Sequence, residues 1–453
     1  MKRRFFLLLS ILTLFLINKN VYAKDTVYSL NKYKEEKLDF IIDSYNEESK
    51  KDGNIVAGTF LKETIKENEK DYNDYQIIII KYNKKGKIVW EYSYGKNKED
   101  KINTISYSYN DNGQIDGYLI SLSKSYNIIS TENVEKDENQ KNTPIFLKLD
   151  LDGNLLEEKD INLNENTEIK RIIPSYQNNT VNGYYSISFS NSKKIELTKY
   201  ALDLSLEWNK EYSSENEITS IDIIPYNVDE NTTNYIFLRT EKKEDEELTN
   251  IELIDKDGNI IKKLQENVTN YSNTKLLNTS SGYILYGVTD EVKLKNGKDS
   301  YFIKKYNQEF EEEWEYFGTI SIDKNKSISL KETSLDKYFL LYTTTSNSIE
   351  VVTIEKEGTL INKIKKIKND YYTVENFNIK KNTLYLIGQI NCPEDDNCEY
   401  DKNSLYLVSD EDKVIEVKEE DSNNALLFVS ILIVVIIIIV TIRNKKRRLN
   451  ESK

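Results

Sequence analysis

The sequence predicts an all-β protein: a seven-bladed β-propeller outside the cell, followed by one C-terminal transmembrane helix. Three observations predict this. A sequence motif of two short β-rich segments on either side of a polar turn occurs seven times along the chain. A basic and then apolar segment of the kind that directs secretion opens the chain. An uncharged apolar run of membrane-spanning length lies close to its end.

The recurring motif is clearest at residues 77–95, IIIIKYNKKGKIVWEYSYG. When the chain is aligned on Tyr82, the other copies fall about 50 residues apart after a longer first step. A period of this length is typical of a propeller or another repeat array. The six further copies read KLDLDGNLLE, KYALDLSLEW, LIDKDGNIIK, KYNQEFEEEW, TIEKEGTLIN and VSDEDKVIEV.

Each copy predicts a β-hairpin, because turns such as Asp152-Gly153-Asn154 supply the positive φ that tight hairpins need. A turn and an apolar-rich strand precede each hairpin, as in DGYLISL, and a weaker extended stretch precedes that. Four strands per repeat and seven repeats should close into a ring. The predicted propeller runs from Leu38 to Glu419, and TVYSLNKY at Thr26 is a candidate sealing strand. An open solenoid or two sandwiches are the alternatives.

The segment DGNIVAG with the hairpin that follows resembles the bacterial surface repeat proteins built on Asp-Gly-Gly-Tyr-Ile-Val-Ala-Gly and a Lys-Tyr-Asp-x-x-Gly-Asn-x-x-Trp hairpin. Those repeats resemble the quinoprotein-type propeller repeat. The resemblance is loose and covers most of the chain, but the last two copies lack the tryptophan. It implies the propeller fold and no single activity, and no cofactor-binding set is recognisable.

All three tryptophans of the chain, Trp90, Trp208 and Trp314, lie eight residues after the anchor position of the first, third and fifth copies. A stacking platform for sugars is one interpretation. Because a large aromatic side chain on an outer strand buries much apolar area, we expect them to pack between neighbouring blades as structural repeat aromatics.

The sequences of the two ends predict the subcellular location of the protein. Residues 1–23 form the signal peptide, 24–37 a lead segment, 38–419 the propeller and 420–424 a linker. Residues 425–442 form the transmembrane helix, and 443–453 form a basic tail that stays in the cytoplasm. We therefore expect a single-pass protein of the cell membrane with its bulk outside. The fourth strand of the last blade would end near Glu419 and turn the face with the long loops toward the bilayer.

Composition excludes several functions. The formal net charge is −13, and the expected exported part, residues 24–424, carries 53 Lys and Arg against 75 Asp and Glu, a net charge of −22, so nucleic acid is a poor partner. The chain has no histidine, which excludes Ser-His-Asp and Cys-His catalysis and typical zinc sites. Paired carboxylates remain possible. No catalytic motif is recognisable, and we expect no enzyme, no cofactor and no metal.

Cys392 and Cys398 are the only cysteines, and their short spacing predicts a local disulfide in an exported chain. The acidic residues between them could hold calcium, or could form a solvated loop. Long insertions at 61–75, 124–143 and the cysteine loop share one topological point, between the second and third strands. In a closed ring they cluster on one sector of one face, where binding tends to occur.

The sequence therefore predicts a membrane-anchored extracellular propeller that serves as a non-enzymatic binding or assembly module for a membrane-proximal protein at the cell surface. The alternative is an extracellular glycan-binding or glycan-acting propeller, either lectin-like or a carboxylate-based hydrolase. A pocket with two converging carboxylates and aromatic side chains would favour the alternative.

Overall fold

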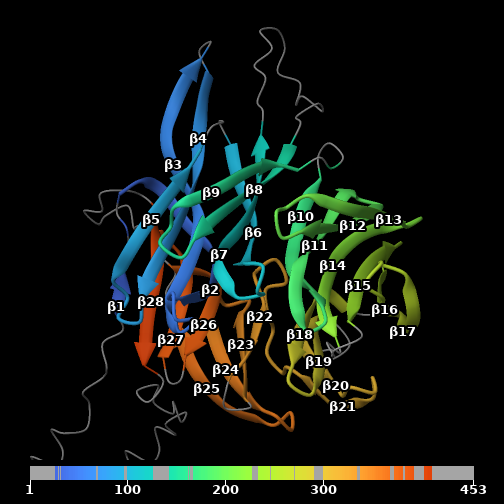
Figure 1. Cartoon of the computed structure of the whole chain (residues 1–453). Coiled ribbons are helices and arrows are strands. Elements are labelled where there is room, and N and C mark those ends of the chain that lie inside the picture. Colours follow the sequence, from blue (N-terminus) through green and yellow to red (C-terminus); the bar gives the residue numbers. More distant parts are fainter. Residues whose placement is uncertain are drawn as a thin grey trace, which may run out of the picture.

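The computed structural model shows a seven-bladed β-propeller, with sheets of antiparallel strands arranged around a common axis (Figure 1). The structure describes residues 26–410 with gaps at 29, 31, 68–69, 96–98, 126–141, 162, 164–166, 227–232, 245, 270, 290–298, 334–336, 368–371, 381–382 and 392–401. Within these residues every regular element is a strand, and none of them forms a helix that could cross a membrane. The predicted transmembrane helix lies outside them.

The chain builds each blade as a meander from the axis outward. The first three blades are β2 (Lys34–Tyr45), β3 (Lys51–Glu67), β4 (Lys70–Asn83) and β5 (Ile88–Tyr94); β6 (Glu99–Tyr109), β7 (Ile115–Ser125), β8 (Asn142–Asp150) and β9 (Leu155–Asp160); and β10 (Glu168–Gln177), β11 (Thr180–Asn191), β12 (Lys194–Ala201) and β13 (Leu206–Ser213). Blades 1 and 2 share one sheet, because Tyr75 of β4 pairs with Glu99 of β6.

Blades 4 to 7 follow the same order, and the last takes its outermost strand from the N-terminus. They are β14 (Glu217–Tyr226), β15 (Asn234–Lys243), β16 (Glu246–Ile254) and β17 (Ile260–Val268); β18 (Tyr271–Thr279), β19 (Gly282–Thr289), β20 (Ser300–Tyr306) and β21 (Glu312–Phe317); β22 (Ser329–Glu332), β23 (Lys337–Thr343), β24 (Ile349–Glu355) and β25 (Leu360–Ile367); and β26 (Tyr372–Lys380), β27 (Thr383–Asn391), β28 (Lys402–Asp410) and β1 (Thr26–Tyr28).

The ring closes through β1, which pairs antiparallel with β28 in the register Thr26↔Val408 to Tyr28↔Tyr406. This corrects the prediction that a strand ending near Glu419 forms the outer edge of blade 7. That edge is taken by a strand from the N-terminal segment, and residues 411–453 lie outside the described part of the chain. Since β28 is a third strand, its last residue, Asp410, lies on the face opposite the loops that join second to third strands.

A polar network within each of the first two blades links the lysine of the repeated hairpin motif to the aspartate of the turn before the second strand. In blade 1 the Asp52 carboxylate accepts a hydrogen bond from the Ser44 hydroxyl at 2.6 Å and pairs with the Lys81 ammonium at 2.9 Å. In blade 2 Asp116 pairs with Lys148 at 3.1 Å in the same way. Each network ties the first three strands of a blade together near one end. Paired in this manner, the charges satisfy one another where little water reaches them.

Tyrosines at the start of the second strands link neighbouring blades. The Tyr184 hydroxyl of β11 accepts a hydrogen bond of 2.9 Å from the backbone N–H of Tyr109, in the preceding blade. Tyr118 accepts one in the same way from Tyr45, and Tyr235 accepts one from Tyr176, each at 3.3 Å. Burial of the rings raises the pKa of Tyr118, Tyr184 and Tyr235, so these hydroxyl groups stay neutral.

Each tryptophan packs over the hairpin turn of the next blade. Trp90 lies against Gly153 and donates a hydrogen bond of 3.0 Å to the Leu151 carbonyl. Trp314 lies against Gly358 in the same way, and Trp208 against Gly258. Tyr28 of β1 takes this place between blades 7 and 1, with its hydroxyl bonded to the Lys85 carbonyl at 2.7 Å. The tryptophans thus lie as wedges between neighbouring blades.

The long insertions differ from simple loops where the structure describes them. Residues 61–75 continue β3 and β4 as a paired hairpin out to Glu67↔Lys70, and this hairpin projects beyond the other blades (Figure 1). Residues 126–141 and the loop with Cys392 and Cys398 lie outside the described residues, so the predicted disulfide and the predicted loop sector stay predictions.

We predict that Gly153→Ala lowers the free energy of unfolding by about 2–3 kcal/mol, against about 1 kcal/mol for Gly258→Ala. Both glycines have positive φ, at 85° and 73°. A Cβ at Gly153 would lie 2.6 Å from the Trp90 ring, whereas at Gly258 its nearest neighbour is 3.1 Å away. Urea denaturation of both variants measures the difference. Equal losses would contradict the role given to the Trp90 contact.

Candidate functional site

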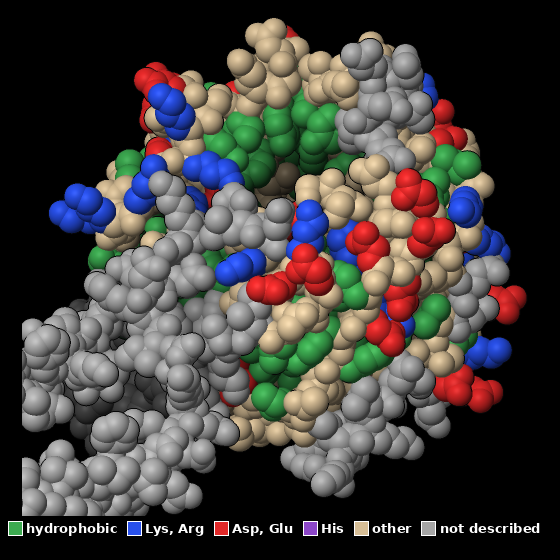
Figure 2. All heavy atoms as spheres, turned by 90° about the horizontal axis from the view of Figure 1, so that it is seen from below, with side chains coloured by type: hydrophobic (Ala, Val, Ile, Leu, Met, Phe, Trp, Pro, Cys, Tyr) green, Lys and Arg blue, Asp and Glu red, His purple; other side chains and the backbone are tan. Residues whose placement is uncertain are grey.

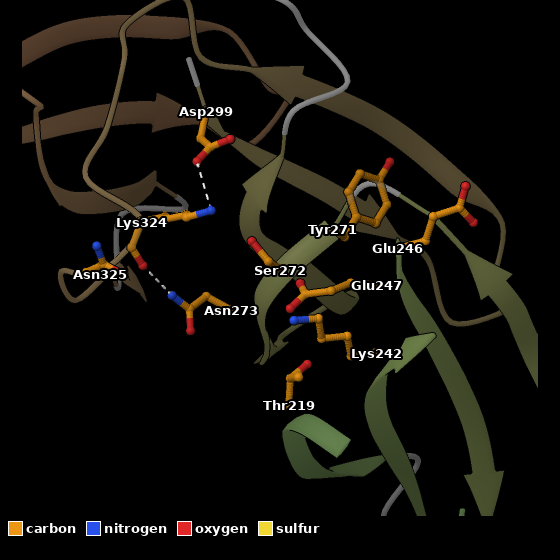
Figure 3. Close-up of a pocket in the computed structure, with 10 residues that line it drawn as sticks. All are labelled: Thr219, Lys242, Glu246, Glu247, Tyr271, Ser272, Asn273, Asp299, Lys324 and Asn325. Carbon is orange, nitrogen blue, oxygen red and sulfur yellow. Dashed lines mark hydrogen bonds and ion pairs between the residues drawn. The ribbon is translucent and has the colours of Figure 1, made fainter. Parts of the chain in front are cut away.

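A polar cavity of about 600 Å³ opens between blades 4, 5 and 6 (Figure 3). Its walls come from the ends of strands on the face where second strands turn into third strands and where blades are joined. The lining residues are Thr219 on β14, Lys242 on β15, Glu246 and Glu247 on β16, Tyr271, Ser272 and Asn273 on β18, Asp299 before β20, and Lys324 and Asn325 before β22. Three separate blades therefore converge on one pocket.

Buried threonines join the strands behind this pocket. The Thr240 hydroxyl lies 3.1 Å from that of Thr249 and 2.6 Å from that of Thr274, so one chain of hydroxyl groups links β15, β16 and β18. Ser220 of β14 adds a hydrogen bond of 2.8 Å to the Thr274 carbonyl. Because all four strands are cross-linked in this way, the side chains at their ends are held on a rigid support.

Glu247 is the group in this cavity with the most unusual environment. One of its carboxyl oxygens is buried and has no hydrogen-bond partner among the described residues. Burial raises the pKa of Glu247, while a hydrogen bond from Thr219 and the charges of Lys324 and Lys242 act against that rise. A carboxyl group in such surroundings holds its proton more strongly than a free one does, which suits a group that donates a proton or a hydrogen bond.

Asp299 provides a second carboxyl group from a different blade. Its carboxylate lies 3.8 Å from the Lys324 ammonium, and the Lys324 carbonyl in turn accepts a hydrogen bond of 2.7 Å from Asn273. Figure 3 shows Asp299 and Lys324 on one side of the pocket and Glu247 with Lys242 on another. Glu246 points away from this group. The pocket thus presents two acids in different environments, two ammonium groups, hydroxyl groups and the edge of Tyr271.

The sequence did not single out this pocket. The predicted binding sector lay at blades 7, 1 and 2, whereas the pocket lies at blades 4, 5 and 6 on the same face. Residues 290–298, between β19 and β20, are an insertion of the same topological type. This insertion is the feature of the sequence that could have indicated a site near blade 5. None of Trp90, Trp208 or Trp314 lines the pocket. No group of three or more acidic, histidine or cysteine side chains suited to a metal occurs in the described part of the chain.

Comparison with solved structures gives distant similarity only. A protein assigned as a 6-phosphogluconolactonase from Bacteroides uniformis matches with a TM-score of 0.41 and 12% identity over 79% of this chain and 93% of its own. The periplasmic gluconolactonase PpgL of Pseudomonas aeruginosa matches with a TM-score of 0.43 and 8% identity over 83% and 99%. A Trypanosoma rangeli sialidase in complex with 2,3-difluorosialic acid matches with a TM-score of 0.40 and 10% identity over 87% and 60%. No protein-family profile and no curated protein sequence matches the chain.

The expectation that the protein is not an enzyme is corrected by these findings. Structures with a similar trace include lactonases, so the absence of a familiar catalytic motif does not separate this chain from enzymes. Physically, the absence of histidine removes one class of proton-transfer group and leaves carboxyl groups available. Similarity at these TM-scores assigns neither activity to this chain.

We predict that wild-type protein loses stability relative to Glu247→Gln as the pH rises from about 4 to 7. A carboxyl group whose pKa is raised by folding stabilises the fold below its unfolded pKa of about 4.3, and that contribution disappears as the pH passes the folded value. Thermal unfolding of both proteins across this range measures the change. The matched variant Glu246→Gln, at an exposed position, should follow the wild type throughout. A difference between wild type and Glu247→Gln that is independent of pH would contradict the prediction.

Proposed function

We propose that the protein is an extracellular glycan-acting propeller whose pocket between blades 4, 5 and 6 binds a sugar unit and hydrolyses its glycosidic bond. The observation that carries the proposal is the buried, unpartnered oxygen of Glu247 in a pocket that also contains Asp299. Polyhydroxylated ligands suit such a site, because hydroxyl, amide, ammonium and carboxyl groups converge there. Lectin-like binding without hydrolysis is the second form of the same proposal.

In the proposed reaction, protonated Glu247 donates its proton to the oxygen of the leaving sugar. Asp299, which forms an ion pair with Lys324, assists the attack on the anomeric carbon, either directly or through water. Water adds across the glycosidic bond, and Glu247 recovers a proton at the end of the cycle. Lys242 and Lys324 stabilise the ionised carboxylates between these steps.

The test measures new reducing ends released by the purified ectodomain from a panel of cell-wall and exported polysaccharides. Glu247→Gln should lower kcat about 100-fold or more and change KM by less than about threefold, because it removes the proton and keeps the shape. Glu246→Gln should retain activity. If no polysaccharide releases reducing ends and none binds in a way that depends on Glu247, the proposal is wrong.

The remaining part of the proposal concerns the membrane. Strand β28 ends at Asp410, on the face where third strands turn into fourth strands, and the predicted membrane helix begins 15 residues later, at residue 425. Large apolar side chains are exposed next to these turns, at the first positions of outer strands. They are Ile88, Val89, Leu155, Leu156, Leu206, Ile260, Ile261 and Leu360. Figure 2 shows this side from below, with hydrophobic side chains among acidic and basic ones and a hollow in the surface.

We therefore propose that this apolar rim faces the bilayer and that the pocket faces outward, which reverses the orientation predicted from the sequence. Val89 is 55% exposed and lies on the rim, whereas Glu246 is exposed at the pocket. A fluorophore on Val89→Cys in proteoliposomes should be quenched by spin-labelled lipid more strongly than one on Glu246→Cys. Both variants would carry serine at residues 392 and 398. Stronger quenching at residue 246 would contradict the orientation.

A further inference from the structure

The innermost strands of three blades bring three basic side chains together at the centre of the ring. Arg171 lies on β10, Lys275 on β18 and Lys331 on β22, and the charges of Arg171 and Lys275 both act on the Lys331 ammonium. Asp43 of β2, in blade 1, also acts on it. Groups on blades 1, 3, 5 and 6 can act on one another in this way only across the central axis.

One carboxylate accompanies this cluster, and it is already engaged. Asp222 of β14 pairs with the Arg171 guanidinium at 2.5 Å. Its two oxygens also accept backbone N–H groups, from Ile223 at 2.9 Å and from Leu276 at 2.7 Å. These contacts fix Asp222 beside Arg171, and its charge also acts on Lys275.

The two lysines have little else to neutralise them. The Lys275 ammonium donates a hydrogen bond of 3.0 Å to the uncharged Ile328 carbonyl. No hydrogen bond or ion pair joins Lys331 to any residue that the structure describes. Asp43 is itself paired with Lys51 at 2.5 Å and Lys380 at 3.2 Å, so its charge is already shared.

The electrostatics agree with this geometry. Burial, with the nearby charges of Arg171 and Lys275, lowers the pKa of Lys331 to about 8. Burial and Arg171 lower the pKa of Lys275, against the opposing charge of Asp222. Three cations therefore lie near one another at the axis of a protein that is acidic overall, with the Lys275 side chain open to solvent. An anion bound beside them would relieve their repulsion.

We propose that the centre of the propeller is a binding site for a phosphate-type oxyanion, held by Arg171, Lys275 and Lys331. The neutral hydroxyl of Tyr286 lies close enough to Asp222 and Arg171 to feel their charges, and it borders the same space. The ligand is inorganic phosphate or the phosphate group of a larger molecule. This site is separate from the pocket with Glu247 and does not depend on the function proposed for it.

The test compares melting temperatures of the folded ectodomain in sodium phosphate and in sodium chloride of equal ionic strength. Phosphate should raise the melting temperature of the wild type. Lys331→Met and Lys275→Met should weaken phosphate binding about tenfold or more, as measured by calorimetry. The control Lys85→Met removes an exposed lysine from a hairpin turn and should retain the phosphate effect.

A measurement without phosphate distinguishes a binding role from a structural one. Lys331→Met removes an unneutralised charge, so it should melt at or above the wild-type temperature in chloride. A lower melting temperature there would show that Lys331 supports the fold and would overturn the proposal. An equal phosphate effect in wild type and Lys331→Met, or none in the wild type, would also overturn it. Glucose 6-phosphate in place of inorganic phosphate shows whether a sugar phosphate shares the site.

Discussion

The contact between the two ends of the ring is the interaction on which the rest of this structure depends. Glu36 is fully buried at this junction, and its carboxylate accepts hydrogen bonds from the backbone N–H groups of Lys32 and Tyr33 at 3.0 and 2.8 Å. Its other oxygen accepts the hydroxyl of Ser404 at 2.9 Å, in blade 7. Because a buried carboxylate is tolerated only when its oxygens are satisfied, Glu36 ties the N-terminal segment to β28 specifically.

Closure matters because no blade buries both of its faces alone. Without β1 the last sheet would end in β28, with an open row of backbone N–H and C=O groups. Tyr82 of blade 1 stacks on Tyr406 of blade 7 with centroids 4.0 Å apart, and this contact exists only in a closed ring. The pocket and the central cluster depend on the same constraint, since each collects side chains from three or more blades whose relative positions the ring fixes.

The repeat period, the glycine turns and the order of strands were readable from the sequence because each blade repeats one local pattern. Trp90 and Gly153 show why hairpins with a tryptophan alternate with hairpins that have a glycine turn. The indole of one blade packs over the turn of the next, where a Cβ would collide with it. Closure by the segment that begins at Thr26 was predicted only as a candidate, since three residues, Thr26 to Tyr28, carry little periodic signal, and the pairing of β1 with β28 confirms it. A fourth strand ending near Glu419 would have completed the seventh repeat. Instead, β1 pairs with β28 and occupies the outer edge of blade 7.

The two candidate sites could not be predicted in the same way, because they depend on contacts between blades. Glu247 and Asp299 are more than 50 positions apart in the chain, and acidic residues are so common in it that no pair stands out. Arg171, Lys275 and Lys331 each look like an ordinary charge on a short strand. Only the ring brings them to one axis, where their charges act on one another.

Hydrogen–deuterium exchange on the amides of β28 tests the closure of the ring most directly. The full chain should protect those amides of residues 406–408 whose N–H groups point toward β1 as strongly as the amides of the central strand β12. A chain that starts at Lys32 should lose protection there first and keep it in β12. Equal protection of residues 406–408 with and without Thr26–Tyr28 would contradict closure by the N-terminal strand.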